Sequence, residues 1–431
     1  MRPAPVRLTL PALRAPTLQL RARRRAMAAP AHTVPRASAA AAAGATATAA
    51  YVAYYLLRCR LPGRIRAGAT ALNAAVLART PSLHAPYTPP FWAANAWVQL
   101  VIFIIRTRAL PRSPPFRRQK LVAPDGGTVA LDWLDENEAP LPASAPLLLI
   151  LHTITGTSRD FLVLARAARA RGFRPVVCVR RGHLGEALTA PRVNLLGCTA
   201  DLRQQLAAAQ AAYPDAPVTM IGASAGTGLL VRYLGEEGSA ARGRIAGAVA
   251  VCPGYDTSEG GAFSRFAPAL DAHLLAVCKK FFLRSRNDAV LANVPGIAEL
   301  RAARGIAEYQ RRAYQLEGYA SVDEMHKHTN PMGVAAAIRA PLLVINAADD
   351  PVCHVSNVHD NAALFDEPHD RMLLLTDRGS HCTFLEGVLW PRQVSWADRV
   401  ALDYLQTVLA LRAEEQAAAP AEAEPALAVG K

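Results

Sequence analysis

Residues 217–230, PVTMIGASAGTGLL, contain a short apolar run, a turn of small residues and the start of an apolar helical pattern. Within this stretch Gly222, Ser224 and Gly226 spell GxSxG. The motif predicts a sharp turn from a strand into a helix, because the two glycines let the backbones approach closely and leave the serine hydroxyl exposed. We therefore interpret Ser224 as a nucleophile. The alternative is that the small residues only permit tight packing of strand against helix.

Short apolar runs alternate with helical patterns on both sides of this turn. Such alternation predicts an α/β fold, in which a mostly parallel sheet is covered by helices on both faces. The stretch between Cys252 and Pro341 is too long for a simple crossover and has helical periodicity, so we predict a helical cap at 254–338. The predicted parallel strands are 146–152, 174–179, 217–224, 245–252, 341–347 and 371–376.

A nucleophilic serine needs a base that takes its proton, and an acid that orients the base. With this motif the partners follow in the order serine, acid, histidine. Asp349 and Asp350 come directly after the predicted strand 341–347. We favour Asp350 as the acid, because the proline that follows it stiffens the turn. Asp349 is the alternative, and Asp256, after the preceding strand, is a third candidate.

His381 is the predicted general base. It lies in TDRGSHCTFLEG, on a loop of small residues directly after the last predicted strand, where the chain order requires the base. The HKH sequence at 326–328 is too isolated to indicate a metal site. Less well placed histidines lie between the acid and the last strand or in the predicted cap: His354, His359, His369, His326 and His328.

Two backbone amides are expected to stabilise the oxyanion of the reaction. One is the amide of Ala225, directly after the nucleophile. The other comes from the loop after the first parallel strand, and the amides of Thr153 and Ile154 are the two candidates.

With these residues placed, the chain resembles the type 4 branch of the α/β-hydrolase superfamily, which contains esterases, phospholipase-like enzymes and medium-chain acyltransferases. The resemblance implies an α/β-hydrolase fold and gives Ser224, Asp350 and His381 the roles of nucleophile, acid and base. The sequence departs from the branch at Thr153, where glycine is usual, and at Ala225, where a bulkier residue is often found. The resemblance extends from about residue 89 to residue 411 and rests on LVAPDGGTVALDW, HTITGTSRDF, RPVVCVRRGHLGE, GCTADLRQQLAAAQAAYPDAPVTMIGASAG, RYLGEEG, EGYASVDEMHKHTNP, PLLVINAADDPV and GSHCTFLEG.

Charge is unevenly distributed along the chain, whose net charge is +14. Residues 1–124 contain 19 Arg or Lys and no acid, because the first acidic residue is Asp125. A basic, acid-free leader beside a mildly acidic body favours targeting and contact with anionic lipid headgroups. A nucleic-acid-binding protein would carry basic patches on its folded domain, so we expect no nucleic-acid partner.

Residues 38–57 are uncharged for 20 residues, which is long enough for a helix to cross a hydrocarbon core of roughly 30 Å. We predict a transmembrane helix there, and the alternative is a buried or signal-like helix. Members of the branch commonly carry an N-terminal membrane segment. The predicted organisation is a basic leader or targeting segment at 1–37, the transmembrane helix at 38–57, a membrane-proximal region at 58–115 with an interfacial segment at 91–105, an α/β-hydrolase domain at 116–411 and a disordered tail at 412–431.

The seven cysteines are odd in number and widely spaced, and no two form a CxxC pair. This pattern predicts neither a disulfide framework nor a zinc site, and it favours a reducing compartment. We expect no metal and no cofactor.

The leading hypothesis is a membrane-anchored serine hydrolase that cleaves acyl esters of lipids through an acyl-enzyme on Ser224. An acyltransferase would use the same residues and differ only in whether water or an alcohol takes the acyl group. A non-catalytic membrane scaffold is the third hypothesis, and its mark would be loss of one of the three residues. The expected partners are a lipid or acyl-ester substrate and a membrane that the chain crosses once. The plastid, the mitochondrion and the endoplasmic reticulum remain open as its location, and the sequence predicts no oligomeric state.

Overall fold

The computed structural model of the protein describes residues 36–136, 139–258 and 260–418. The chain divides into two compact units, Met1–Tyr51 and Val52–Lys431. Helix α1 (Arg36–Tyr54) continues into the π-helical turn η1 (Tyr55–Cys59). Within the described residues, Ala40–Cys59 is the one helical stretch whose length and composition would allow it to cross a membrane. Apart from its last two residues, the predicted leader at 1–37 lies outside the described part of the chain.

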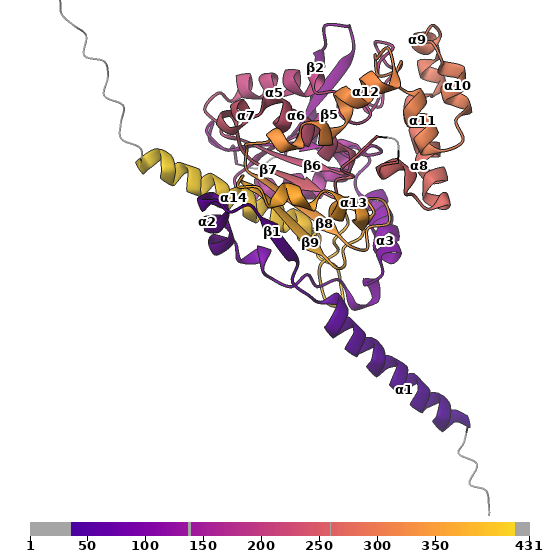
Figure 1. Ribbon diagram of the computed structural model, residues 1–431, viewed down its shortest axis with the longest axis vertical. Coiled ribbons are helices and arrows are strands. Elements are labelled where there is room, and N and C mark those ends of the chain that lie inside the picture. The colour runs from indigo at the N-terminus through magenta and orange to yellow at the C-terminus, as the bar shows by residue number, and fades with distance from the viewer. Residues whose placement is uncertain (1–35, 137–138, 259, 419–431) are drawn as a thin grey trace, which may run out of the picture. The chain divides into compact units, whose positions relative to one another are not determined.

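The second unit is built on one nine-stranded sheet with the order β1-β9-β8-β7-β6-β4-β5-β3-β2. The six predicted parallel runs form its adjacent central strands, and the antiparallel strands flank them (Figure 1). The predicted fold class is therefore confirmed. The strands are β1 (Arg64–Ala67), β2 (Phe116–Val122), β3 (Thr128–Leu134), β4 (Leu147–Leu151), β5 (Arg174–Val179), β6 (Val218–Ala223), β7 (Ile245–Val251), β8 (Leu342–Ala347) and β9 (Arg371–Thr376).

Helices cover both faces of the sheet, because successive side chains of a strand point to opposite faces and both sets are apolar here. Leu148 and Ile150 of β4 belong to a core with helices of one face, and Leu147, Leu149 and Leu151 belong to a core with helices of the other. The first face carries α2 (Ala71–Arg79), α4 (Leu162–Arg169) and α14 (Trp396–Ala418), and the second carries α5 (Ala200–Ala212), α6 (Ala225–Glu237), α7 (Ser239–Arg244) and α13 (Val355–Asp360). A fully buried aliphatic side chain contributes about 1.5–3 kcal/mol, so these two cores are the main source of stability.

The compact body extends on both sides of the predicted domain at 116–411. Strand β1 pairs antiparallel with β9 at the edge of the sheet, and Asn73 of α2 donates to the Gly68 carbonyl oxygen at 2.8 Å. At the other end α14 continues through Ala418, where Arg79 and Glu414 form an ion pair of 2.7 Å. The prediction of disorder is therefore wrong for 412–418, where an Ala- and Glu-rich sequence favours helix. Residues 419–431 lie outside the described chain.

The predicted cap region consists of short helices joined by turns. An apolar cluster that includes Leu275, Phe282 and Tyr309 joins residues 275–316 of this region to the loop at 188–196, and Ile154 and Ala225 pack against the same cluster. Figure 1 shows α8 to α11 gathered in one lobe. The helices are α8 (Pro268–Phe282), α9 (Asp288–Leu291), α10 (Ile297–Ala302), α11 (Ile306–Arg312) and α12 (Val322–Thr329), with 3₁₀ turns η5 (Ala262–Ser264), η6 (Ser285–Asn287), η7 (Pro331–Gly333) and η8 (Ala335–Ala337).

The interfacial segment predicted at 91–105 forms the 3₁₀ turn η3 (Phe91–Ala93) and helix α3 (Ala96–Ala109). The remaining 3₁₀ turns are η2 (Pro81–Leu83), η4 (Ser158–Phe161) and η9 (Ala362–Phe365).

Candidate active site

Ser224 lies in the turn between β6 and α6, with a positive backbone φ of 50°. This conformation is strained for a residue other than glycine and persists only where the surroundings hold it. The flanking glycines show how it is held. A Cβ on Gly222 would lie 2.7 Å from the Gly226 carbonyl oxygen, and a Cβ on Gly226 would overlap the carbonyl oxygen of Leu151. Strand and helix therefore meet at backbone contact, as the motif predicts.

The structure brings the three predicted catalytic residues together from the ends of three parallel strands. Nε2 of His381, after β9, lies 2.9 Å from Oγ of Ser224, after β6. Nδ1 of His381 lies 2.9 Å from Oδ2 of Asp350, after β8. The side chain of His381 is 12% exposed and that of Asp350 is fully buried. An imidazole between a hydroxyl and a carboxylate can accept the hydroxyl proton while the carboxylate fixes its tautomer.

The two neighbouring aspartates have different contacts. Oδ1 of Asp350 accepts hydrogen bonds from the amides of Val352 and Cys353 at 2.7 and 2.9 Å, which leaves Oδ2 for His381. Asp349 instead accepts from the Ser380 amide at 2.9 Å. Burial raises the pKa of Asp349 to about 6. Asp350 thus contacts the histidine, and Asp349 holds the loop that carries it.

The loop that carries His381 is strained and held from several sides. Ser380, Cys382 and Phe384 all have positive φ angles, of 59°, 55° and 38°. Besides the bond to Asp349, the Ser380 hydroxyl donates to the Ala96 carbonyl oxygen of α3 at 2.8 Å. The Leu385 amide donates to Oε1 of Gln99 in the same helix at 3.1 Å. Helix α3 therefore supports the histidine loop, since it holds the backbone on both sides of His381.

Three cysteines lie close to His381, at Cys252, Cys353 and Cys382. In the part of the chain that the structure describes, two groups of side chains have atoms that could jointly hold a metal ion: Cys252 and Cys382 with His381, and Asp350 and Cys353 with His381. Burial raises the pKa of the Cys353 thiol to about 11 and that of Cys252 well above its usual value, so these two thiols stay neutral near pH 7. Both ring nitrogens of His381 already face other partners, so the arrangement suits proton transfer better than metal binding.

The charge state of His381 is set by opposing effects. Burial lowers its pKa, but the negative charge of Asp350 and the hydrogen bond to it outweigh burial. The net result is a pKa well above the usual value for histidine. Asp350 is therefore positioned to stabilise an imidazolium at His381, as transfer of a proton from the Ser224 hydroxyl would require.

The loop with Thr153 and Ile154 passes close to the start of α6, since a Cβ on Gly226 would lie 2.9 Å from the His152 carbonyl oxygen. The amide of Ala225 is at the first position of α6, where a helix has no internal partner for it. Among the described residues, the amides of Thr153, Ile154 and Ala225 donate no hydrogen bond. These three amides, one at the start of α6 and two in the loop after β4, are free to donate to the negative charge that develops on an oxyanion.

Arg180 holds the loop after β4 that contains Thr153 and Ile154, which we name the oxyanion loop. The sequence did not reveal this role of Arg180. Its buried guanidinium donates to the carbonyl oxygens of His152 at 3.1 Å, Thr153 at 2.7 Å and Leu195 at 2.7 Å. Because a trans peptide is planar, holding the carbonyl oxygens of residues 152 and 153 on one side turns the amides of Thr153 and Ile154 to the other. The only signal in the sequence is the pair of arginines directly after an apolar strand, at 180–181.

The charge of Arg180 shapes its surroundings. Burial lowers its own pKa to about 10 and raises that of the nearby Glu317 to about 8, so the carboxyl is largely protonated near pH 7. Burial and the Arg180 charge lower the pKa of His183 to about 3, and Nε2 of this neutral ring donates to the Ile154 carbonyl oxygen at 2.8 Å. The loop is therefore fixed by one cation and neutral groups, which places positive potential behind the candidate oxyanion site.

Two other candidate residues, Asp256 and His328, have contacts outside the triad. Oδ1 of Asp256 accepts from the Ser258 amide and from Nδ2 of Asn330, both at 2.8 Å. His328 stacks on Tyr319 in the cap region. The structure therefore gives neither residue a contact with Ser224.

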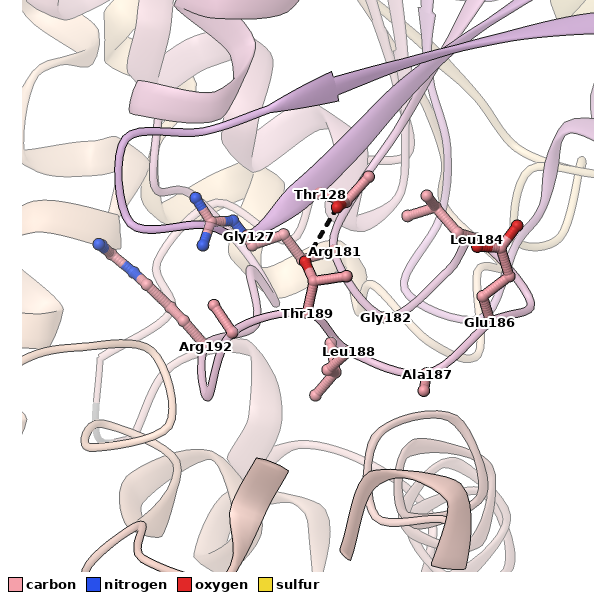
Figure 2. Close-up of a pocket in the computed structure, with 11 residues that line it drawn as sticks. Gly127, Thr128, Arg181, Gly182, Leu184, Glu186, Ala187, Leu188, Thr189 and Arg192 are labelled. Atoms are coloured by element: carbon pink, nitrogen blue, oxygen red, sulfur yellow. Dashed lines mark hydrogen bonds between the residues drawn. The ribbon is translucent and has the colours of Figure 1, made fainter. Parts of the chain in front are cut away.

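A separate pocket lies beside the turn between β2 and β3 (Figure 2). Thr128 and Thr189 share a hydrogen bond of 2.9 Å across it, and Nη2 of Arg181 pairs with Asp201 at 2.8 Å. Since Arg181 is also paired with Asp125, its charge is neutralised within the protein. The lining contains none of the triad residues: Gly127, Thr128, Arg181, Gly182, Leu184, Glu186, Ala187, Leu188, Thr189, Ala190 and Arg192.

The chain is similar to several known proteins. Residues 142–387 match the family described as "Serine aminopeptidase, S33". Phospholipase ABHD3 of Mus musculus is 28% identical over 372 residues, which cover 84% of this chain and 88% of the relative. Monoacylglycerol lipase ABHD2 of Mus musculus is 24% identical over 389 residues, which cover 83% and 90%. Esterase Pf2001 of Pyrococcus furiosus superposes with a TM-score of 0.42 at 15% identity, over 70% of this chain and 94% of that structure.

The family match covers more than half of the chain, including the turn at Ser224 and the loops after β8 and β9. The chain therefore belongs to this family and, with it, to the type 4 branch of the α/β-hydrolase superfamily.

Proposed function

We propose that the protein is a membrane-anchored serine hydrolase that cleaves acyl esters of lipids through an acyl-enzyme on Ser224. Family membership and the two relatives make the chain a carboxylic ester hydrolase. Their names, phospholipase and monoacylglycerol lipase, support a lipid ester as substrate. The observation that carries the proposal is the relay of Ser224, His381 and Asp350, with both contacts of the imidazole at 2.9 Å.

In the acylation step, Oγ of Ser224 attacks the ester carbonyl carbon and its proton passes to Nε2 of His381. The carbonyl oxygen becomes an oxyanion, which the amide of Ala225 and that of Thr153 or Ile154 stabilise. When the tetrahedral intermediate collapses, the bond to the leaving alcohol breaks and His381 returns the proton to that alcohol. The acyl group stays on Ser224.

In the deacylation step, water takes the place of the alcohol. His381 accepts a proton from the water as its oxygen attacks the acyl carbon, and the same amides stabilise the second oxyanion. The bond to Ser224 then breaks and Oγ regains a proton from His381. The products are a carboxylic acid and an unchanged enzyme.

Residues 38–57 are the proposed anchor. The segment is uncharged, and the helix Ala40–Cys59 has the length that a span requires. The full chain should therefore stay with membranes during an alkaline carbonate wash. Attachment through arginines alone would be released by salt, because exposed charges interact weakly beyond about 10 Å at 0.1 M. Release by carbonate would show that the segment does not span.

The catalytic proposal is tested on separate samples of the full chain: one is labelled with a fluorophosphonate, and the other is assayed for release of fatty acid from phospholipids and monoacylglycerols. We expect labelling and hydrolysis in the wild-type protein and neither in Ser224→Ala. A protein that is labelled and cleaves aminoacyl amides but no lipid ester would fail the proposal for substrate class. Transfer of the acyl group to an added alcohol in preference to water would make the protein an acyltransferase.

A further inference from the structure

Two segments far apart in the sequence form an apolar surface on the catalytic body, which we name the α3 face. After residue 59, every large apolar side chain that the described structure leaves exposed lies in these two segments, with the exception of Val122. Trp390 is 82% exposed and Trp97 is 48% exposed. The α3 face consists of Phe91, Trp92, Trp97, Val98, Val101, Ile104, Ile105, Val388, Leu389 and Trp390.

Hydrogen bonds hold the two segments side by side. The Phe91 amide donates to the Val388 carbonyl oxygen at 2.9 Å, and Nε1 of Trp92 donates to that of Leu389 at 2.6 Å. Further along, Nη2 of Arg106 donates to the Gln393 carbonyl oxygen at 3.0 Å. The α3 face is therefore one continuous surface. Contiguous exposed apolar surface of this kind marks an interaction site in a soluble domain.

The composition around the α3 face indicates its partner. Three of the five tryptophans of the chain lie on it, and tryptophan favours the boundary between lipid headgroups and acyl chains. Arg108, Arg112 and Arg392 are exposed nearby in the sequence, and no acidic residue occurs at 1–124 or 387–397. An apolar surface whose flanking sequence carries exposed arginines and no acid is complementary to a phospholipid surface that carries negative charge.

The end of the proposed anchor lies next to this surface. Tyr55 and Cys59 form a small buried cluster with Ala94, between η3 and α3. The Tyr55 hydroxyl donates to the Pro89 carbonyl oxygen at 2.7 Å. A segment that ends a membrane span lies at the membrane boundary, so residues packed against it lie near that boundary too.

We propose that the α3 face inserts into the headgroup region of a phospholipid leaflet and holds the catalytic loop at the membrane surface. The opposite side of α3 supports that loop, since Gln99 is fully buried and its Oε1 accepts from the Leu385 amide and the Tyr87 hydroxyl. One helix thus contacts lipid on its outer side and fixes the His381 loop on its inner side. The lipid substrate in this inference rests on the proposed function, whereas the contact between the α3 face and the membrane does not.

The tryptophans themselves report the contact. The full chain is reconstituted into vesicles of phosphatidylcholine and phosphatidylglycerol, with either ordinary or brominated acyl chains, and its fluorescence is compared. Bromine quenches only nearby indoles, so quenching should come from Trp92, Trp97 and Trp390. Trp97→Phe and Trp390→Phe should each lower the quenched fraction, whereas Trp133→Phe, which removes a buried indole, should raise it. A quenched fraction unchanged in the Trp97→Phe, Trp390→Phe double variant would overturn the proposal.

A second measurement separates lipid contact from support of the catalytic loop. Val101→Asp and Leu389→Asp place a carboxylate in the α3 face, and Val122→Asp places one at an exposed valine outside it. We expect the first two to reduce hydrolysis of vesicle lipid by about tenfold, because burying a charge in lipid is costly. Hydrolysis of a short soluble ester should change less than about twofold, and Val122→Asp should affect neither.

Three other outcomes of these measurements would each decide whether the α3 face contacts a membrane. Equal losses on vesicles and on the soluble ester would mean that the α3 face only supports the catalytic loop, which would overturn the proposal. If brominated lipid did not quench the wild-type protein and the protein formed a stable dimer in detergent, the α3 face would be a contact between two copies. That result would also overturn the proposal. A wild-type protein that shows quenching but cleaves no lipid ester would keep the α3 face as a membrane contact and refute the lipid substrate.

Discussion

The loop after β9 joins two regions that depend on different physics. At its inner end, the side chain of His381 is only 12% exposed and both ring nitrogens have partners at 2.9 Å. At its outer end, Trp390 is 82% exposed and lies on the α3 face. The inner region works through the positions of a few atoms, so one substitution there should remove nearly all activity. The outer region works through summed apolar area, so single substitutions there should cause partial losses.

The largest loss should come from Ser224→Ala, which removes the proposed nucleophile and little volume. We expect kcat to fall by about 10⁴ to 10⁶ on a medium-chain ester, with the folded structure intact by circular dichroism. Activity within tenfold of the wild type would mean that the inner region does not work through this serine.

The next largest loss should separate the two neighbouring aspartates. Asp350→Asn should reduce kcat by about 10⁴, because the amide cannot hold the tautomer of His381 that accepts the serine proton. Asp349→Asn should cost far less, since an asparagine oxygen can still accept from the Ser380 amide. A side-by-side assay that ranked the two variants in the opposite order would move the role of the acid to Asp349.

Arg180→Lys should produce an intermediate loss. Lysine keeps the positive charge but cannot reach three carbonyl oxygens at once, so the amides of Thr153 and Ile154 should lose their alignment. We expect kcat to fall by about 10² while KM changes little, because the oxyanion forms only in the transition state. Arg181→Lys is the matched control, since Arg181 pairs with Asp125 and Asp201 outside the site. Equal effects in both variants would contradict a specific role for Arg180.

The smallest expected effect is a graded dependence on pH. His381 must be neutral to accept a proton, and its pKa is raised, so the acid limb of kcat/KM should lie above pH 6.5. Activity should rise about tenfold per pH unit along that limb. The raised pKa also stabilises the fold fully below pH 6.5, and this contribution is lost as the pH rises through the folded pKa. Asp350→Asn should move the limb to lower pH, and an unmoved limb would assign it to another group.

How much of the molecule could be predicted depends on whether a feature is encoded by neighbouring residues or by residues far apart in the chain. The six parallel strands and the turn at Ser224 were predicted because continuous apolar runs and the GxSxG spacing are local patterns. Strand β1, with the sequence RIRA, was not predicted, because two of its four residues are charged and its partner β9 lies about 300 residues away. An edge strand tolerates such charges, so its sequence gives little sign of its pairing.

By itself the sequence determined the fold class and the position of the GxSxG turn, since each follows from residues close together in the chain. The chain order of the acid and the histidine was expected from the order that accompanies this motif. Only the tertiary structure decided which of two adjacent aspartates contacts His381, that Arg180 turns the oxyanion loop, and that α3 lies against the loop at 388–390. These are contacts between distant segments. Whether two polar groups meet depends on how the sheet and its helices pack, and neither composition nor periodicity records that packing.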